Sequence, residues 1–111
     1  MQMKIKATHL SPASIKNLKK ESHNISFQFT PHSLKRLGEW HLTTESVHGA
    51  IQEGEIIEYH TLQGSRRVLF RDVNGVCAVA DLDVHKIITA YKNSEDDKHL
   101  YINRKPYIFG V

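Results

Sequence analysis

The Asn-Gly dipeptide at 74–75 constrains the fold of this chain more than any other feature. It separates two segments with strand patterns, 66–71 and 76–80, and Asn-Gly is typical of a tight turn between two antiparallel strands. Val68 and Phe70 lie on the same side of the first segment, because successive side chains in a strand point to opposite faces. The chain is therefore expected to contain an antiparallel hairpin centred on this turn.

Further strand and helix patterns surround the hairpin. The segments 55–60 and 85–91 each predict a strand, so the second half of the chain predicts a four-stranded antiparallel meander. Before it, the Thr-Pro pair that opens 30–39 predicts a helix cap and first turn, and a second helix is expected over 43–53 with Gly54 after its end. The expected class is α+β, with N-terminal helices packed on one face of a four-stranded antiparallel sheet.

The beginning of the chain predicts a short extension over 1–26, ahead of a single α+β domain over 27–111. A strand is expected over 4–8, and a Ser-Pro cap precedes a helix over 12–20. The alternating segment 24–29 indicates either a half-buried strand or an extended lead-in. The extension is therefore small compared with the domain that follows it.

Composition narrows the choice of partners without fixing one. The net charge is +3 and the pI is about 9.1, which suits nucleic-acid binding but does not require it. Lys16, Lys19 and Lys20 make the first helix basic, either as a surface that follows phosphates or as a solvated face. Cys77 is the only cysteine and stands in an apolar run, typical of a small buried side chain.

Three features that the sequence lacks indicate the cellular compartment of the protein. A single cysteine permits no internal disulfide, and no apolar segment is long enough to cross a membrane. The start of the chain has no apolar core of a secretion signal. We therefore expect a cytoplasmic protein that does not bind membranes.

His32 and Arg36 lie four residues apart near the start of the helix expected over 30–39. Spacing of four places both side chains on one helix face, where they can reach the same anion. The start of a helix also favours negative charge, because its backbone N–H groups point outward. The pair therefore indicates a phosphate-bearing ligand.

A run of positions in and after the first helix of the domain, followed by a helix that ends in Gly54, forms a recognisable pattern. The positions are His32, Ser33, Arg36, Leu37, Trp40, His41, Leu42 and Thr43. With them, the segment 27–92 resembles the bacterial domain of unknown function 4258, whose pattern is His-Ala-x-x-Arg-Met-x-x-Arg-Gly-Ile-Thr before a Glu-rich helix that ends in Gly. Two family positions differ, because its second arginine is Trp40 here and its glycine is His41. The resemblance implies the fold of RelE-like and BrnT-like toxins, which are small ribonuclease-type folds with helices on an antiparallel sheet.

One functional hypothesis is a metal-independent ribonuclease toxin. Such cleavage needs a base, an acid and cations that stabilise charge on the phosphate. His32 would act as base or acid, while Arg36 and Arg67 would hold the phosphate oxygens. Arg67 shares its strand face with Arg71, whereas Arg66 faces the other way. Candidates for the second proton-transfer group or for positioning the backbone are His85, Thr89 and Tyr91.

A plainer alternative remains for the helix pair. His32 would cap its own helix, Arg36 would pair with Glu39, and the two would only fix the helix against the sheet. Metal binding is not expected, because no histidine falls in a paired ligand spacing and His41 with His48 is the closest approach to one. No cofactor motif is present.

A different class also fits the chain: a non-catalytic protein of phage or prophage type that modulates or inhibits a host toxin or nuclease. Exposed aromatic side chains are the usual anchors of such interfaces, and Trp40 and Tyr107 are among the candidates. The aromatic tail 101–111 would either cover the domain's own core or dock on a partner or on a second copy in a homodimer. The expected partner is thus either RNA or a host protein.

Overall fold

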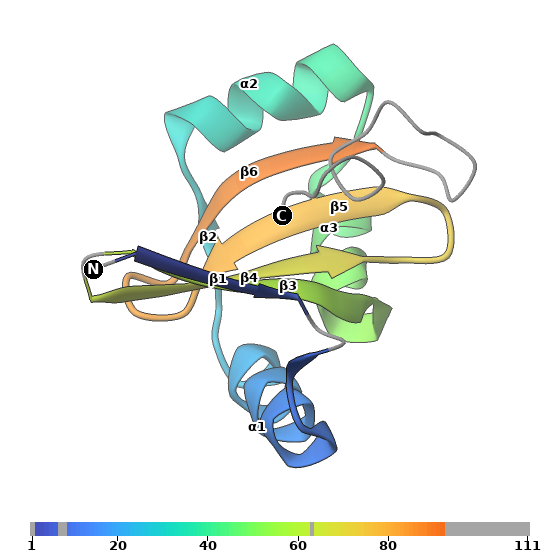
Figure 1. The fold of residues 1–111 in the computed structure, drawn as a ribbon. Coiled ribbons are helices and arrows are strands. Elements are labelled where there is room, and N and C mark those ends of the chain that lie inside the picture. The colour runs from blue at the N-terminus through green and yellow to red at the C-terminus, as the bar shows by residue number, and fades with distance from the viewer. Residues whose placement is uncertain (1, 7–8, 63, 93–111) are drawn as a thin grey trace.

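The sheet carries six strands and mixes parallel and antiparallel pairs, in the order β1-β3-β4-β5-β6-β2. The computed structural model describes residues 2–6, 9–62 and 64–92 (Figure 1). The predicted α+β class is confirmed. The elements in chain order are β1 (Gln2–Lys6), α1 (Pro12–His23), β2 (Gln28–Phe29), α2 (Pro31–Trp40), α3 (Thr44–Glu53), β3 (Glu55–Leu62), β4 (Ser65–Arg71), β5 (Val76–Asp81) and β6 (Lys86–Lys92).

The prediction of a four-stranded antiparallel sheet is wrong in its strand count. The expected meander is present as β3, β4, β5 and β6, but β1 adds to one edge, antiparallel to β3. At the other edge the two residues of β2 pair in parallel with β6. Both additions join segments more than 50 residues apart, such as Gln2 with Leu62 and Phe29 with Ile87. Local patterns carry no information on such pairings, which depend on how the whole chain closes.

The three helices begin where the sequence places their caps. Thr30 caps α2, and its hydroxyl accepts a hydrogen bond from the backbone N–H of Ser33 at 3.0 Å. The Ser33 hydroxyl accepts one in return from the backbone N–H of Thr30 at 2.8 Å, which completes a capping box. Thr43 and Ser46 repeat this arrangement at the start of α3, and Ser11 caps α1. Local side-chain chemistry therefore sets the helix starts.

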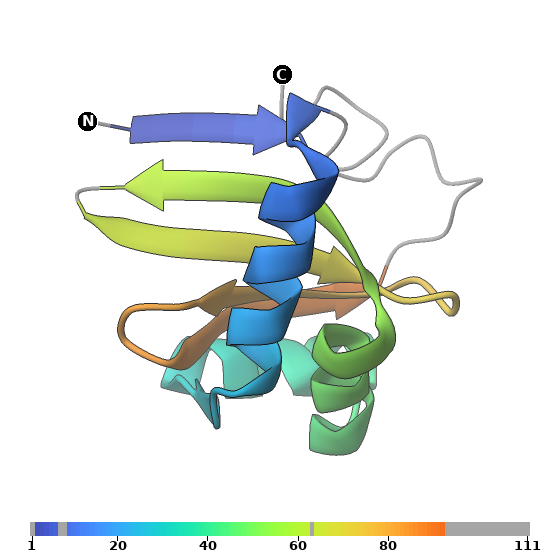
Figure 2. The ribbon, with the colours of Figure 1, turned by 90° about the horizontal axis from the view of Figure 1, so that it is seen from below.

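All three helices pack on one side of the curved sheet. Figure 2 shows α1 and α3 on the same side of the strands, and α2 packs along β6. The core between helices and sheet includes Val47 and Ile51 from α3 and Val68 and Phe70 from β4, all at most 1% exposed. The side of β4 that carries Val68 and Phe70 is therefore the helix side, as their alternation predicts.

The first quarter of the chain is joined to the sheet by Arg66. Its guanidinium donates to both carboxylate oxygens of Glu21 in α1, at 3.0 and 2.8 Å. It also donates to Asp83 after β5, at 2.8 Å. These ion pairs raise the pKa of Arg66 above its ordinary value. The segment expected as an extension thus contributes β1 to the sheet and α1 to the helix layer.

The turn between β4 and β5 follows its sequence signal. Gly75 has φ +84°, a conformation that favours glycine. The carboxylate of Asp72 accepts hydrogen bonds from the backbone N–H groups of Asn74 and Val76, both at 2.9 Å.

Within the described ranges no helix is long and apolar enough to cross a membrane. The expected tail contacts, including Tyr107, lie outside the described residues.

Candidate functional site

The side of the sheet that faces away from the helices collects polar and ionisable side chains. We call it the polar face. Strand alternation and the pairing register assign residues to it, because residues paired across strands point to the same side. Its members include Glu58, His60, Arg67, Leu69, Arg71, Cys77, Val79, Asp81, Thr89 and Tyr91.

Two rows cross the polar face at right angles to the strands. In one row His60 pairs with Arg67, and Arg67 pairs with Asp81. In the other row Arg71 pairs with Cys77, and Cys77 pairs with Tyr91. Directly paired residues have Cβ atoms about 5 Å apart, whereas four residues along a strand span about 13 Å. The rows are therefore neighbours but separate clusters.

Arg67 is held by a buried carboxylate. Its Nε lies 3.3 Å from Oδ2 of Asp81, which is 1% exposed. The other oxygen of Asp81 accepts from the backbone N–H groups of Asp83 and Val84, at 2.9 and 3.1 Å. In the described part of the chain, the two terminal nitrogens of Arg67 make no hydrogen bond. Asp81 therefore orients the guanidinium and leaves its terminal nitrogens available to an anion.

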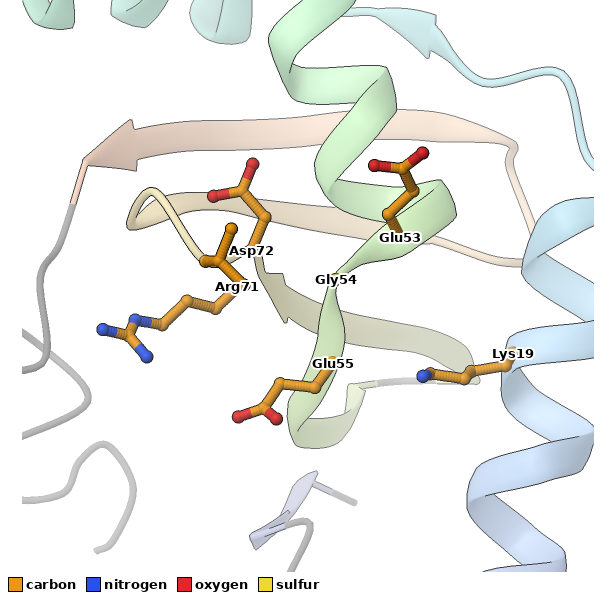
Figure 3. A pocket seen from close by; sticks show the side chains of 7 residues that line it. Lys19, Glu53, Gly54, Glu55, Arg71 and Asp72 are labelled. Atoms are coloured by element: carbon orange, nitrogen blue, oxygen red, sulfur yellow. The ribbon is translucent and has the colours of Figure 1, made fainter.

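Arg71 has no carboxylate bound to it among the described residues. Its Nε is buried and makes no hydrogen bond. A buried donor without a partner costs about 1–3 kcal/mol, so an oxygen-bearing ligand at this position would recover that cost. Figure 3 shows the Arg71 side chain extending away from Gly54 and Lys19.

Tyr91, Cys77 and Glu58 belong to the same cluster as Arg71. Burial raises the pKa of Tyr91, and the nearby Cys77 and Glu58 raise it further. Burial also raises the pKa of Cys77 to about 12, against smaller lowering effects of Arg71 and of a hydrogen bond with Tyr91. The phenol and the thiol are therefore both protonated at neutral pH. Tyr91 can donate a proton or a hydrogen bond, whereas Cys77 is a poor nucleophile.

His32 and Arg36 meet on α2, as their spacing predicts, but not on the polar face. The Nε of Arg36 lies 3.4 Å from Nε2 of His32, and its terminal nitrogen donates to Glu39. Because α2 packs on the helix side of β6, this pair does not join Arg67 and Tyr91. The structure thus divides the four predicted catalytic residues between two sides of the sheet.

The other predicted binding residues are also divided. Arg71 and Thr89 lie on the polar face. Trp40 ends α2 and is 38% exposed, on the helix side of the sheet. His85 is exposed in the turn before β6, with φ +61°.

Sequence reasoning missed Glu58, His60 and Asp81. The alternation within β3 would place Glu58 and His60 on one side, but a bulge between Ile56 and Glu58 shifts the register and hides which side that is. Asp81 is the last residue of β5, and its carboxylate serves both the turn and Arg67.

A hollow of about 300 Å³ lies at the end of β4, between α1 and the loop after α3. Gly54 forms its floor in an extended conformation, φ −78°. A Cβ on Gly54 would lie 2.3 Å from the carbonyl oxygen of Ala50 and 2.7 Å from that of Arg71. Glycine is therefore required here by close approach of two backbones. Figure 3 shows the charged side chains around the hollow, which are Lys19, Glu53, Glu55, Arg71 and Asp72.

No set of three or more metal-ligating side chains comes together among the residues that the structure describes. Comparison with known proteins gives no assignment either: no protein-family model, no curated protein and no solved structure matches this chain. The geometry of the polar face is therefore the basis for a functional assignment.

Proposed function

We propose that this chain is a small RNA-directed module, similar in fold to RelE-like and BrnT-like toxins, and that it cleaves RNA without a metal at its polar face. The observation that carries the proposal is the cluster of Glu58, Arg71 and Tyr91. It combines a carboxylate, an arginine to which no carboxylate of the described residues is bound, and a protonated phenol. These are the group types that cleavage of a phosphodiester requires.

Each group has one role in the proposed reaction. Glu58 takes the proton of the ribose 2′-hydroxyl while the 2′-oxygen attacks phosphorus and forms a new P–O bond. Arg71 stabilises the charge that builds on the phosphate oxygens. The P–O5′ bond breaks, and the 5′-oxygen leaves with a proton from Tyr91. The products are a 2′,3′-cyclic phosphate and a 5′-hydroxyl, and exchange with water restores both side chains.

Arg67 extends the site toward a neighbouring phosphate. It is on the same strand and face as Arg71, about 13 Å away along β4. Its terminal nitrogens make no bond in the described residues, and Asp81 fixes its orientation. A row of phosphate-binding groups of this kind favours an extended, single-stranded substrate.

Support for the likeness to these toxins comes from His41. It has φ +56° and ends α2 in a left-handed conformation. The backbone N–H of Leu42 donates to the carbonyl of Leu37 at 2.9 Å, as in a Schellman motif. Glycine is the usual residue at such a position, and glycine is what domain 4258 has there. A left-handed residue at this position is what the glycine of that pattern would favour, and this supports the proposed likeness.

Cleavage of single-stranded RNA by purified protein tests the proposal. Tyr91→Phe and Arg71→Gln are each expected to lower the cleavage rate by about 100-fold or more, because each removes a group that acts on the reacting phosphate. The matched control is Arg36→Gln, a change of the same kind on α2, which should keep the wild-type rate. Melting temperatures establish that all three variants fold.

Two results would contradict the proposal. If wild-type protein leaves every RNA intact, the chain is not this enzyme. If Arg36→Gln or His32→Ala abolishes cleavage while the polar-face variants retain it, the site is on α2.

A protein-binding modulator is the second candidate function, and the exposure of apolar side chains on α2 favours it. Leu34 is 52% exposed and Trp40 is 38% exposed. A modulator that anchors through this helix would co-purify with one host protein at a stoichiometric level. Trp40→Ala would remove that partner, whereas Tyr91→Phe would not.

A further inference from the structure

The outer surface of α1 carries a stripe of positive charge. Lys16, Lys19, Lys20 and His23 are spaced by three and four residues, so they lie along one side of the helix. Lys16, Lys20 and His23 are exposed and Lys19 is half-buried. The core-facing residues of the helix, Ile15 and Leu18, lie on a different side. We call these four residues the α1 stripe.

Among the residues that the structure describes, no acidic side chain forms an ion pair with the α1 stripe. Glu21 is the only acidic residue in α1, and both of its oxygens are held by Arg66 of β4. The three lysines make no hydrogen bond or ion pair with any residue that the structure describes. The three lysines of the stripe therefore keep their charge at the surface.

We propose that the α1 stripe is a second RNA-binding surface, which holds backbone phosphates of a single strand that extends beyond the polar face. This inference rests on the proposed function. The proposed ligand is a polyanion, because the stripe presents several cations that pair with no described residue and has no apolar side chains at its centre. Such a surface complements the charged backbone of RNA. From Lys16 to His23 the stripe is about 10 Å long, enough for a few phosphates of one strand.

The hollow at the end of β4 separates the two surfaces. Lys19 of the α1 stripe and Arg71 of the polar face both line it. Glu53, Glu55 and Asp72 line it as well and repel phosphate. A strand bound at both surfaces must bridge this acidic gap, so only a long RNA is expected to use the α1 stripe.

Fluorescence anisotropy with labelled oligouridine tests this length dependence. The variant Lys16→Gln/Lys20→Gln is compared with a matched control, Lys35→Gln/Lys92→Gln, which removes two exposed lysines from α2 and β6. For an RNA of about 30 nucleotides at low salt, the α1 variant should bind about tenfold more weakly than the control. Its plot of log K against log[salt] should be shallower by about 1.4, since each single-strand phosphate contact contributes about 0.7. For an RNA of about 6 nucleotides the two variants should bind equally.

The outcomes separate this inference from the proposed function. Equal binding of the long RNA by both double variants overturns the α1 stripe and leaves cleavage at the polar face untouched. A second outcome is that the α1 variant loses binding of the long RNA while the wild-type protein cleaves no RNA. That result supports RNA binding by the α1 stripe and overturns the proposal of RNA cleavage at the polar face. Absence of RNA binding by the wild-type protein overturns both.

Discussion

Arginine has opposite surroundings on the two sides of this molecule. On α2, Arg36 is bound within its own helix by His32 and Glu39, four and three residues away. On β4, Arg67 has one buried partner and Arg71 has none in the described residues. A helix supplies partners from neighbouring turns, whereas a strand residue depends on what lies across the sheet. The arginine with the fewest protein partners is therefore the stronger candidate for a ligand.

Gly54→Ala would remove the difference between the arginines of α2 and β4, because it displaces Arg71. The added Cβ would collide with the backbone carbonyls of Ala50 and Arg71, neither of which can rotate away. We expect the free energy of unfolding to fall by about 3 kcal/mol or more, measured by urea denaturation. Gly49→Ala is the matched control, because nothing lies within 4 Å of a Cβ there, and it should not destabilise the protein. A stable Gly54→Ala protein would contradict the close packing of α3 on β4.

Removal of the acidic partner compares the contributions of the Arg67–Asp81 and Arg36–Glu39 ion pairs to the free energy of unfolding. Asp81→Ala should lower the free energy of unfolding by about 2 kcal/mol, because it leaves Arg67 and two backbone N–H groups without their buried acceptor. Glu39→Ala should change it by less than about 0.5 kcal/mol, because both partners of that pair are 41% exposed. Equal effects in a chemical denaturation series would show that the two pairs do not differ in burial.

The sequence predicted what local chemistry determines. The Thr-Pro and Ser-Pro caps placed the starts of α1 and α2, and Asn-Gly placed the β4–β5 turn. Alternation put Arg67 and Arg71 on the side opposite Val68. The residues of the site that the sequence placed correctly are those whose side of a strand follows from alternation alone.

The features that the sequence did not reveal depend on pairing between segments far apart in the chain. The packing of α2 on the helix side separates His32 from Tyr91, and no local pattern encodes that choice. The β3 bulge obscured Glu58, and β1 required a partner more than 50 residues away. These features appear only when the chain closes into one sheet.

Alkaline pH should destabilise the polar face selectively. The pKa values of Cys77 and Tyr91 are raised in the folded protein, mainly by burial. The folded state therefore holds protons that the unfolded state loses first, so this stability is complete below about pH 8.5 and decreases as pH rises toward about 12, the folded pKa of Cys77. Cys77 contributes up to about 1.4 kcal/mol per pH unit in that window, and Tyr91 contributes only above about pH 10, its ordinary pKa. Denaturation of Tyr91→Phe should show a weaker decrease than wild type, and an unchanged decrease would contradict the burial of this phenol.

His41→Gly should change only the helix side. A non-glycine residue at φ +56° carries strain of about 1 kcal/mol, so glycine should stabilise the protein by roughly this amount in thermal or urea denaturation. RNA cleavage should be unaffected, because His41 lies at the end of α2. Lower stability would indicate that the His41 side chain makes a contact more valuable than the relief of strain.

The most direct test of the central claim is a titration of labelled protein with a short single-stranded RNA, followed by NMR of the backbone amides. We expect the amide signals of Arg67, Arg71 and Tyr91 to shift, while those of His32 and Arg36 do not. Shifts confined to α2, with β4 and β6 unchanged, would contradict it and place the functional surface on the helix side.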